Sequence, residues 1–583
     1  MALLLRFWRQ YAQRYRLWYV LGLVCLLGTT ALTVAIPGFV EGAVDALDTG
    51  QPATRWAVAV LLAGVAIMVV RTLSRTFFFN PGRAVEFRMK SALFDRLLGM
   101  PRSYFDAMRP GDLINRGTND ANSMRALIGF ASLQLFNVVF ILVLTLGRML
   151  HMDVVLTLAC VGPLAVAAVI LRYAVAKMFR LFAENMAQVS TLSARILETY
   201  GGVAVLQSYN AVPGAMARFD RENDRLLDLS EQVLKVRAWL LPIVSVTGNL
   251  CVVIVLFLGG RKVMHGDGFT VGQLAAFIVY VNILVGGITS FGWLIGAAQR
   301  GYLGLKRMYD VIDAQSDRPA GTAPMPDAAA GLSLAVQGLS FTHHGATAPA
   351  LRDISFSVQP GETLGIFGLT GAGKSTLLNL LARVYDPPAG TVFLSGTDVT
   401  TLPEHAYWQA IAFVSQEPFL FSKSVRENVA VADAADAIDA ERLQRAIEDA
   451  ALGEDVHAFR DGLDTVVGER GITVSGGQRQ RTALARAFYR DYDLLLLDDV
   501  MSAVDHATEK QLVEAIYRRA AGKPTLVVSH RLSVLARADR VIVLDDGQLV
   551  DAGTHAELLT RDGPYARTWR LQQARAEVEA ADV

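Results

Sequence analysis

The chain has 583 residues, of which 52% are hydrophobic, and its 55 basic side chains balance its 55 acidic ones. A length of this order exceeds what one hydrophobic core organises and predicts two or more domains. The zero formal charge argues against a nucleic-acid partner, since phosphate backbones are bound by an excess of Lys and Arg.

Long uncharged apolar runs dominate the first 300 residues. Spanning a bilayer takes roughly 20 apolar residues, and the two shortest runs reach that length through flanking residues by tilting and snorkelling. Buried helices of a soluble fold are the alternative, but soluble folds rarely carry six such runs. The sequence therefore predicts six membrane spans, at residues 17–40, 56–70, 126–147, 154–171, 238–260 and 269–299.

The first run predicts a span and not a cleaved signal peptide, because it is longer than an apolar signal core and lacks a small-residue cleavage site before Pro37. Four arginines precede it within residues 6–16, and three acidic residues follow it within 41–48. The positive-inside rule then places the N-terminus, the long inter-helix loops and the C-terminal half in the cytoplasm. We expect a multi-pass protein of the plasma membrane, here the bacterial inner membrane.

The three cysteines, Cys25, Cys160 and Cys251, all fall inside predicted spans. Their placement indicates neither a disulfide framework nor a metal cluster, and we expect them to act as small apolar residues.

Two charged segments, at about 71–125 and 177–237, separate the second span from the third and the fourth from the fifth. Loops this long need structure of their own. Helical runs within them predict that the membrane helices extend well past the bilayer. Each helix pair is expected to meet at a short turn, near residues 108–115 and 211–216, and these tips are candidates to contact a soluble domain.

The pattern changes after a segment rich in Pro and Ala, at 317–331, which predicts a linker. Short strands and amphipathic helices follow it. The predicted organisation is a transmembrane domain at 1–316, the linker, and an α/β domain at 332–583. The fold class is therefore a six-helix all-α transmembrane domain followed by an α/β domain.

A glycine-rich loop between the predicted strand 363–367 and a helix matches the Walker A pattern, so the fold class of the α/β domain is that of a P-loop ATPase domain. Its glycines let backbone N–H groups surround phosphates, Lys374 reaches the β- and γ-phosphate oxygens, and the Ser375 hydroxyl binds Mg²⁺. The predicted ATP-binding residues here are Gly368, Leu369, Thr370, Gly371, Ala372, Gly373, Lys374, Ser375 and Thr376.

Two further segments point to phosphate chemistry. The apolar run 494–497 predicts a buried parallel strand, and Asp498 at its end suits an Mg²⁺-binding carboxylate. A Ser-Gly-Gly turn at 474–478 opens a helix, which is again a phosphate-facing geometry. Since one chain already has its phosphate loop, this turn is expected to face the γ-phosphate bound by a second chain, through Ser475, Gly476, Gly477 and Gln478.

With these motifs in this order, almost the whole chain resembles an ATP-binding cassette (ABC) transporter of the exporter type. The resemblance implies that 474–478 is the signature motif and 502–505 the D-loop, and that 468–471 contacts the coupling helices. It also implies that Gln416 senses nucleotide beside Mg²⁺ and that His530 is the switch histidine.

Three positions depart from the family pattern. His343 stands where an aromatic side chain stacks on adenine, and imidazole offers less area than Tyr. Val474 replaces the Leu that usually begins the signature motif. Asp499 replaces the Glu that acts as general base, which withdraws the carboxylate by about 1 Å, and a misplacement of this size costs about 10²-fold in rate.

In its Asp-Asp pair the chain resembles the degenerate member of heterodimeric multidrug exporters. The expected function is ATP-driven export of amphiphilic drugs, lipids or peptides by alternating access, as one half of a heterodimer with a weak ATPase site on this chain. The nearest alternative is a homodimeric exporter or lipid flippase. An ATP-gated regulatory protein and an exporter-fold importer are further alternatives, and Asp499 as a tolerated variation also stays open.

Overall fold

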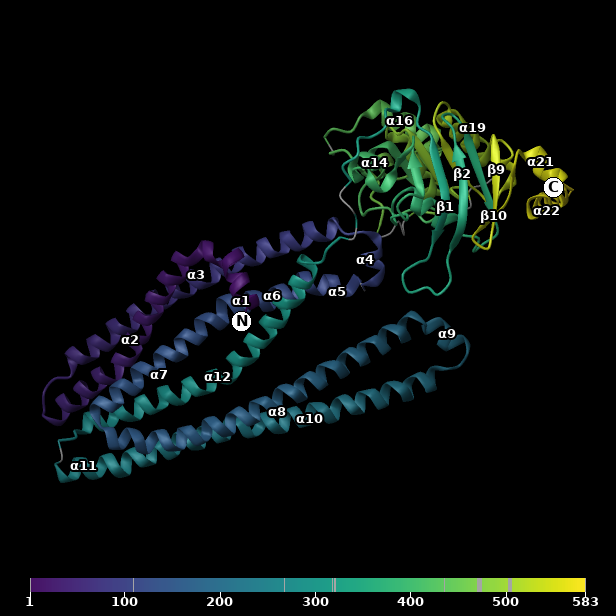
Figure 1. Cartoon of the computed structure of the whole chain (residues 1–583). Coiled ribbons are helices and arrows are strands. Elements are labelled where there is room, and N and C mark those ends of the chain that lie inside the picture. The colour runs from purple at the N-terminus through teal and green to yellow at the C-terminus, as the bar shows by residue number, and fades with distance from the viewer. Residues whose placement is uncertain are drawn as a thin grey trace. The chain divides into compact units, whose positions relative to one another are not determined.

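The computed structural model describes residues 2–108, 110–266, 268–316, 318, 321–434, 436–468, 474–501 and 506–581. The chain forms two compact units (Figure 1). The helical unit comprises Met1–Gly99 and Arg109–Ala314, and the α/β unit comprises Met100–Met108 and Gln315–Val583.

Long helices make up the helical unit, and in the part of the chain that the structure describes five of them are long and apolar enough to cross a membrane. A sixth holds a shorter described apolar segment, Val271–Gly287. The predicted membrane domain is confirmed. Its main helices are α2 (Arg16–Asp48), α3 (Thr54–Leu98), α7 (Ser132–Met152), α8 (Val154–Gly201), α10 (Val212–Ile254) and α12 (Val271–Ile312).

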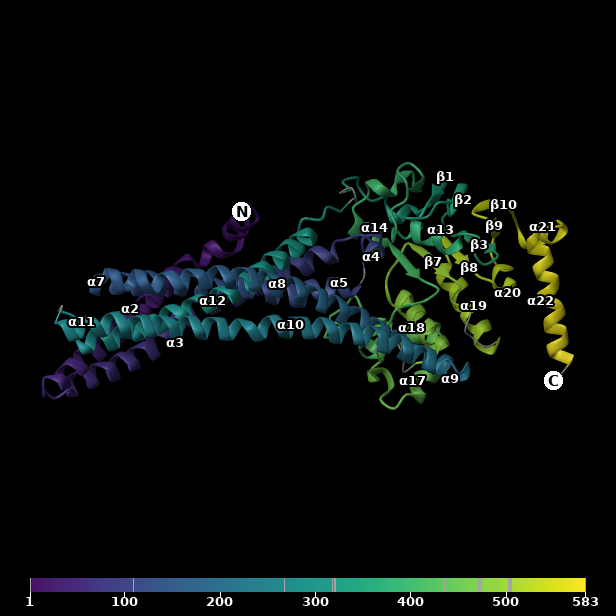
Figure 2. The same ribbon diagram turned by 90° about the horizontal axis from the view of Figure 1, so that it is seen from below.

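The helices run far beyond their apolar parts, as predicted. The 45 residues of α3 and the 48 of α8 give lengths of about 68 and 72 Å at 1.5 Å per residue, more than twice the ~30 Å of a hydrocarbon core. Along these lengths α2 packs on α3, and α8 packs on α10 (Figure 2).

Shorter elements complete the helical unit. They are α1 (Ala2–Phe7), η1 (Trp8–Ala12), η2 (Gln13–Tyr15), α5 (Pro110–Asn115), η3 (Arg116–Asp120), α6 (Ala121–Ala126), η4 (Leu127–Ala131), η5 (Val255–Gly259) and α11 (Gly260–His265).

The turns between the long helices lie earlier in the chain than predicted. Short helices, α4 (Arg102–Ala107) and α9 (Val203–Ser208), occupy these positions. The prediction took Pro110 and Pro213 as turn residues, but each lies in the first turn of a new helix. Proline is favoured there because its missing N–H would have no intrahelical partner.

Helix α4 belongs to the α/β unit, although its sequence lies within the helical half of the chain. The Tyr385 hydroxyl donates to Asp106 Oδ2 at 2.7 Å. Burial and this hydrogen bond together raise the pKa of Tyr385. The contact with the α/β unit is therefore made by α4, which lies before the tip predicted at 108–115.

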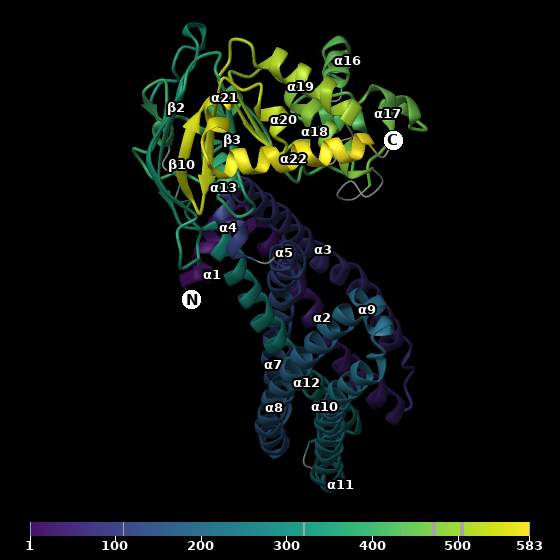
Figure 3. The same ribbon diagram turned by 90° about the vertical axis from the view of Figure 1, so that its right-hand side faces the viewer.

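Two sheets form the core of the α/β unit (Figure 3). The larger has the strand order β10-β9-β3-β8-β7-β6 and is parallel except for the β10–β9 pair. The smaller is antiparallel, with the order β2-β1-β4-β5. The strands are β1 (Leu334–Phe341), β2 (Leu351–Val358), β3 (Thr363–Gly368), β4 (Val392–Leu394), β5 (Thr397–Asp398), β6 (Ile411–Val414), β7 (Leu494–Asp498), β8 (Thr525–Val528), β9 (Arg540–Asp545) and β10 (Gln548–Gly553).

Strands β3, β7 and β8 are buried at every residue, which explains their continuous apolar sequence. The helices of the unit are α13 (Lys374–Leu381), α14 (Glu404–Ala410), α15 (Val425–Val429), α16 (Ala440–Asp449), α17 (Gly453–Ala458), α18 (Gly476–Tyr489), α19 (His506–Ala520), α20 (Leu532–Leu535), α21 (His555–Thr560) and α22 (Pro564–Ala581), with the turns η6 (Ala328–Ala330), η7 (Val399–Thr401) and η8 (Gly462–Asp464). Of these helices, α13, α20 and α22 pack on β3, and α13 also packs on β7.

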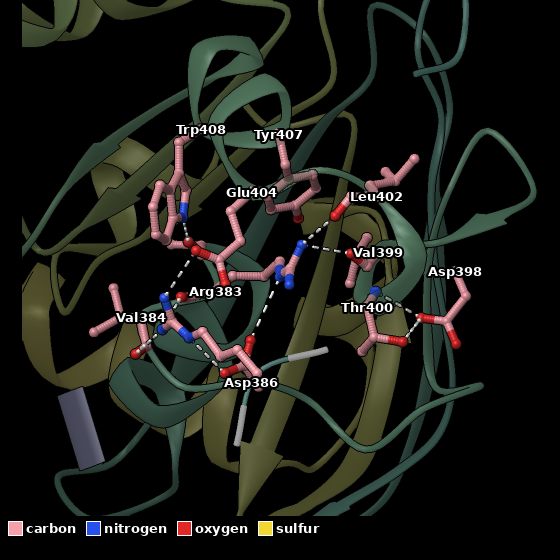
Figure 4. A network of polar contacts seen from close by, with 12 residues as sticks. Arg383, Val384, Asp386, Asp398, Val399, Thr400, Leu402, Glu404, Tyr407 and Trp408 are labelled. Carbon is pink, nitrogen blue, oxygen red and sulfur yellow. Dashed lines mark hydrogen bonds and ion pairs between the residues drawn. The ribbon is translucent and has the colours of Figure 1, made fainter. Parts of the chain in front are cut away.

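The beginning of the α/β unit is anchored by two arginines, one partly buried and one fully buried, that share one carboxylate (Figure 4). Arg318 pairs with Asp386 at 2.7 Å and lies over the Trp408 ring. Arg383 is fully buried and donates to the carbonyl of Val399. Within the segment predicted as a linker, Arg318 is thus held against the α/β unit; Asp317, Pro319 and Ala320 lie outside the described residues.

Candidate functional site

The parallel sheet brings the predicted site residues to one edge. Its neighbouring strands β3, β8, β7 and β6 all end there, with Ile366 opposite Val528, Val528 opposite Asp498 and Leu497 opposite Val414. The loops that follow these strands carry the Walker A segment, His530, Asp499 and Gln416. Carboxyl ends of parallel strands are where ligands bind in open α/β sheets.

The phosphate loop is shaped by glycines with left-handed backbone. Gly371 has φ of +89° and Gly373 of +92°. A Cβ atom at Gly373 would lie 2.8 Å from the carbonyl oxygen of Ala350, so a side chain there would displace the backbone. Glycine is therefore required in the loop between β3 and α13, and phosphate binding by its N–H groups stays a prediction.

Lys374 is nearly buried and bends back over the loop. Its Nζ donates to the carbonyls of Gly368 at 2.8 Å and Leu369 at 2.9 Å. Burial lowers the pKa of its ammonium group, and the carboxylates of Asp498 and Asp499 oppose that shift. The charges of Asp498, Asp499 and Lys374 thus interact with one another in a buried environment.

Asp498, at the end of β7, is 3% exposed. Burial raises its pKa, while a hydrogen bond from Ser375 and the charge of Lys374 act in the opposite direction. A buried carboxylate joined to a hydroxyl suits Mg²⁺, which binds few protein oxygens and keeps several waters. The residues present therefore fit the predicted metal.

Asp499 is also buried, at 4% exposure, and has a left-handed backbone with φ of +48°. Asp adopts this region more readily than most residues. Its N–H donates to the Val528 carbonyl at 3.0 Å, and its Oδ1 accepts from the His530 N–H at 3.3 Å. The predicted general base and the predicted switch histidine are therefore linked through the backbone.

Two residues that sequence reasoning missed hold the loop of His530. Gln572 on α22 donates to the His530 carbonyl at 2.8 Å and accepts from the Leu532 N–H at 3.1 Å. Glu509 on α19 pairs with Arg531 and accepts from Ser533 at 2.8 Å. No local pattern marks Gln572, because its contacts depend on how α22 packs.

His343 lies beside the start of α13. Its Nε2 is 3.2 Å from the Thr376 hydroxyl, and its ring meets the rings of Phe341 and Tyr385 edge-on at 5.0 and 5.3 Å. The predicted adenine-stacking residue is thus placed next to the phosphate loop, within a group of three rings.

The predicted signature turn begins helix α18. Ser475 and Gln478 form a reciprocal cap, in which the Ser475 hydroxyl accepts from the Gln478 N–H and the Gln478 side chain accepts from the Ser475 N–H. Ser475 and Gly476 are exposed, whereas Gly477 is buried. Helix α18 packs on α15, α16 and β6, whereas α13 packs on β3 and β7, so the turn and the phosphate loop belong to different parts of the unit.

The remaining predicted positions are exposed or lie mostly outside the described residues. Gln416 is exposed, two residues after β6. The predicted D-loop at 502–505 lies outside the described residues, as does most of the segment 468–471.

Comparisons with known proteins match both units. Residues 19–288 match the family model of the ABC transporter transmembrane region, and residues 351–502 match that of the ABC transporter. A probable multidrug resistance ABC transporter ATP-binding/permease protein of Bacillus subtilis is 32% identical over 96% of both chains. An ATP-dependent lipid A-core flippase of Alkalilimnicola ehrlichii is 32% identical over 95% of this chain and 94% of its own. The solved structure of a bacterial Atm1-family ABC exporter with ATP bound has a TM-score of 0.80 and 25% identity, covering 96% of this chain and 98% of that one.

Proposed function

Since this chain belongs to the ABC transporter family, with a transmembrane region joined to an ATP-binding cassette, we propose that it exports amphiphilic drugs, lipids or peptides by alternating access. As an ABC exporter it is a membrane protein that binds ATP, couples ATP hydrolysis to transport and works as a dimer. The observation that carries the proposal is the buried group of Lys374, Asp498 and Asp499 on the same chain as the long apolar helices.

The proposed chemistry follows from the described side chains. The phosphate loop and Lys374 hold the β- and γ-phosphates, and the adenine lies against His343. Ser375, Asp498 and Gln416 are the proposed holders of Mg²⁺, which supplies positive charge to the phosphate oxygens when bound. Asp499 orients the attacking water, and His530 contacts the γ-phosphate.

The raised pKa of Asp498 predicts a pH dependence. Protons and Mg²⁺ compete for this carboxylate, so Mg²⁺ binding weakens as pH falls through a pKa that lies above the ordinary 3.8. Below that pKa we expect the Mg²⁺ concentration for half-maximal ATPase to rise about tenfold per pH unit. Excess Mg²⁺ should restore the rate at each pH. A half-maximal Mg²⁺ concentration that stays constant on acidification would contradict this.

Gln572 is expected to position the switch histidine. Gln572→Ala leaves the His530 carbonyl and the Leu532 N–H without their partner, so we expect kcat for ATP to fall about tenfold while KM changes little. Gln573→Ala is the matched control, because Gln573 is exposed on the same helix. Equal kinetics of the two variants would exclude a positioning role.

A heterodimer is the proposed assembly. Each composite site combines the Walker motifs of one chain with the signature turn of the other. The site with Asp499 then turns over slowly, whereas the turn Ser475–Gln478 completes a competent site with a partner's Walker motifs. The substitution of Asp for Glu at position 499 supports this proposal; a homodimer that is slow at both sites is the alternative.

The proposed substrates are amphiphiles because the relatives include a multidrug transporter and lipid A-core flippases. The proposed location is the bacterial inner membrane, with the N-terminus and the ATPase domain in the cytoplasm. The domains are proposed as 1–316 and 332–583, joined by the linker 317–331.

Transport into inverted vesicles tests the function. Purified chain, alone and with the product of a neighbouring ABC reading frame, is reconstituted with fluorescent amphiphiles and a short-chain fluorescent lipid. ATP-dependent movement with the pair and little with the chain alone supports the heterodimer. A stable, fully active homodimer contradicts it, and absence of ATP-dependent movement in every combination contradicts export.

A further inference from the structure

An apolar groove lies in the helical unit beside the N-terminal end of α2. Its volume is about 610 Å³, within the range of roughly 300–1,000 Å³ that is usual for ligand pockets. Its walls come from the N-terminal helix, α2, α3, α7 with the preceding η4, and α12. The residues used below are Trp8, Arg16, Tyr19, Val20, Leu23 and Leu135.

One face of α2 runs along the groove from a charged end to an apolar end. Arg16, Tyr19 with Val20, and Leu23 are spaced by three, four and seven residues, which places them on the same side of a helix. Seven residues correspond to about 10 Å along the axis. Leu135 of α7 lines the groove as well. A ligand along this face would therefore meet a cation first and hydrocarbon afterwards.

Arg16 is the cation of the groove. It is exposed, and its guanidinium group has no ion pair or hydrogen bond within the part of the chain that the structure describes, although its backbone N–H donates to the Gln13 carbonyl. Arg6, by contrast, pairs with Asp313 at 2.5 Å and lies over the Tyr309 ring. No carboxylate belongs to the described residues that line the groove. Its electrostatic preference is therefore for an anion.

Tyr19 gives the wall an unmet hydrogen-bond donor. The residue is 9% exposed, and its hydroxyl is buried without a hydrogen-bond partner among the described residues. Its ring packs against those of Trp8 at 5.5 Å and Phe78 at 5.7 Å. Leaving a buried hydroxyl unpaired is costly, so an acceptor on a bound molecule would be favoured here.

We propose that this groove binds one anionic phospholipid, with its phosphate at Arg16, an ester carbonyl at Tyr19 and an acyl chain against Val20, Leu23 and Leu135. An anionic phospholipid presents an anion, an acceptor and a hydrocarbon chain in this order. A soluble phosphate lacks the chain, and a zwitterionic lipid carries a cation that Arg16 repels. We assign the lipid to the cytoplasmic leaflet. This assignment rests on the proposed function, which places the N-terminus in the cytoplasm.

Lipid retention on the purified full-length protein tests the site. The protein is equilibrated with equal phosphatidylglycerol and phosphatidylcholine, stripped with detergent and weighed by native mass spectrometry. We expect about one retained phosphatidylglycerol per chain. Retention should fall about tenfold in Arg16→Ala, which removes a charge-assisted contact, and about fivefold in Tyr19→Phe, which removes one neutral hydrogen bond. Leu135→Trp, which fills the groove, should also displace the lipid.

Arg14→Ala is the matched control, because it removes the same charge two residues away and Arg14 does not line the groove. Equal loss in both arginine variants would overturn the site, as would equal retention of phosphatidylcholine. If monomers keep the lipid and dimers do not, a second copy fills the groove instead. The assay is repeated on Lys374→Ala protein, in which unchanged retention supports the site whatever the transport assay shows.

Discussion

We expect the Lys374→Ala protein to lose ATP-driven transport and at least about a hundredfold of its ATPase rate. In the structure Nζ of Lys374 lies within the phosphate loop and satisfies the carbonyls of Gly368 and Leu369. In the proposed mechanism the β- and γ-oxygens of ATP would replace these carbonyls, and the lysine would neutralise charge that develops during phosphoryl transfer. Alanine supplies neither contact, so we expect both a lower affinity for ATP and a slower phosphoryl transfer.

The measurement is ATP hydrolysis and substrate movement by the variant, together with any partner, in the same vesicles. Lys423→Ala is the control, because Lys423 is an exposed lysine of the same unit that forms an ion pair with nearby Glu427. The expected control activity is that of the unmodified protein. Transport that persists in Lys374→Ala would point to a protein that binds ATP for regulation and does not pump.

Asp499→Glu is expected to raise turnover at this chain's own site by about ten- to a hundredfold. The Asp499 carboxylate lies against the His530 N–H, and the added methylene advances it by about 1 Å towards the attacking water. The left-handed backbone at φ +48° suits Asp better than Glu. The strain on Glu at this position should reduce the increase in turnover. Asp499→Asn keeps the shape without the base, so it should be slower than the unmodified protein.

The size of the gain in total ATPase distinguishes the two assemblies. In a homodimer both sites change and the increase appears in full. In a heterodimer the partner's competent site already dominates, so the total rate at most about doubles. A rate that matches the unmodified protein, with the partner present, would make Asp499 an incidental variation.

Sequence was a good guide where the local chain determines the structure. Gly371 and Gly373 have a left-handed backbone, and Leu494–Leu497 is apolar throughout because β7 is buried at every residue. The strand–loop–helix arrangement at 363–381 and the buried strand at 494–497 were therefore predicted correctly. The turns were misplaced because proline is compatible both with a turn and with the first turn of a helix.

The missed features depend on distant contacts. Gln572 holds the loop of His530 across 42 residues, and Arg383 is buried beneath Val399 and Tyr407 although its sequence context looks like an exposed basic residue. Periodicity and motif spacing carry no information about which surface a later helix will cover. The Asp499 contact with the His530 N–H belongs to the same class.

Helix α4 has a consequence for the order of folding during synthesis. Its docking partner Tyr385 is 279 residues further along the chain than Asp106. At a synthesis rate of about 5–20 residues per second, α4 emerges from the ribosome tens of seconds before the surface that receives it exists. The membrane helices on either side are thus made while their connection is still undocked. Docking of α4 therefore waits for a surface that is made 279 residues later.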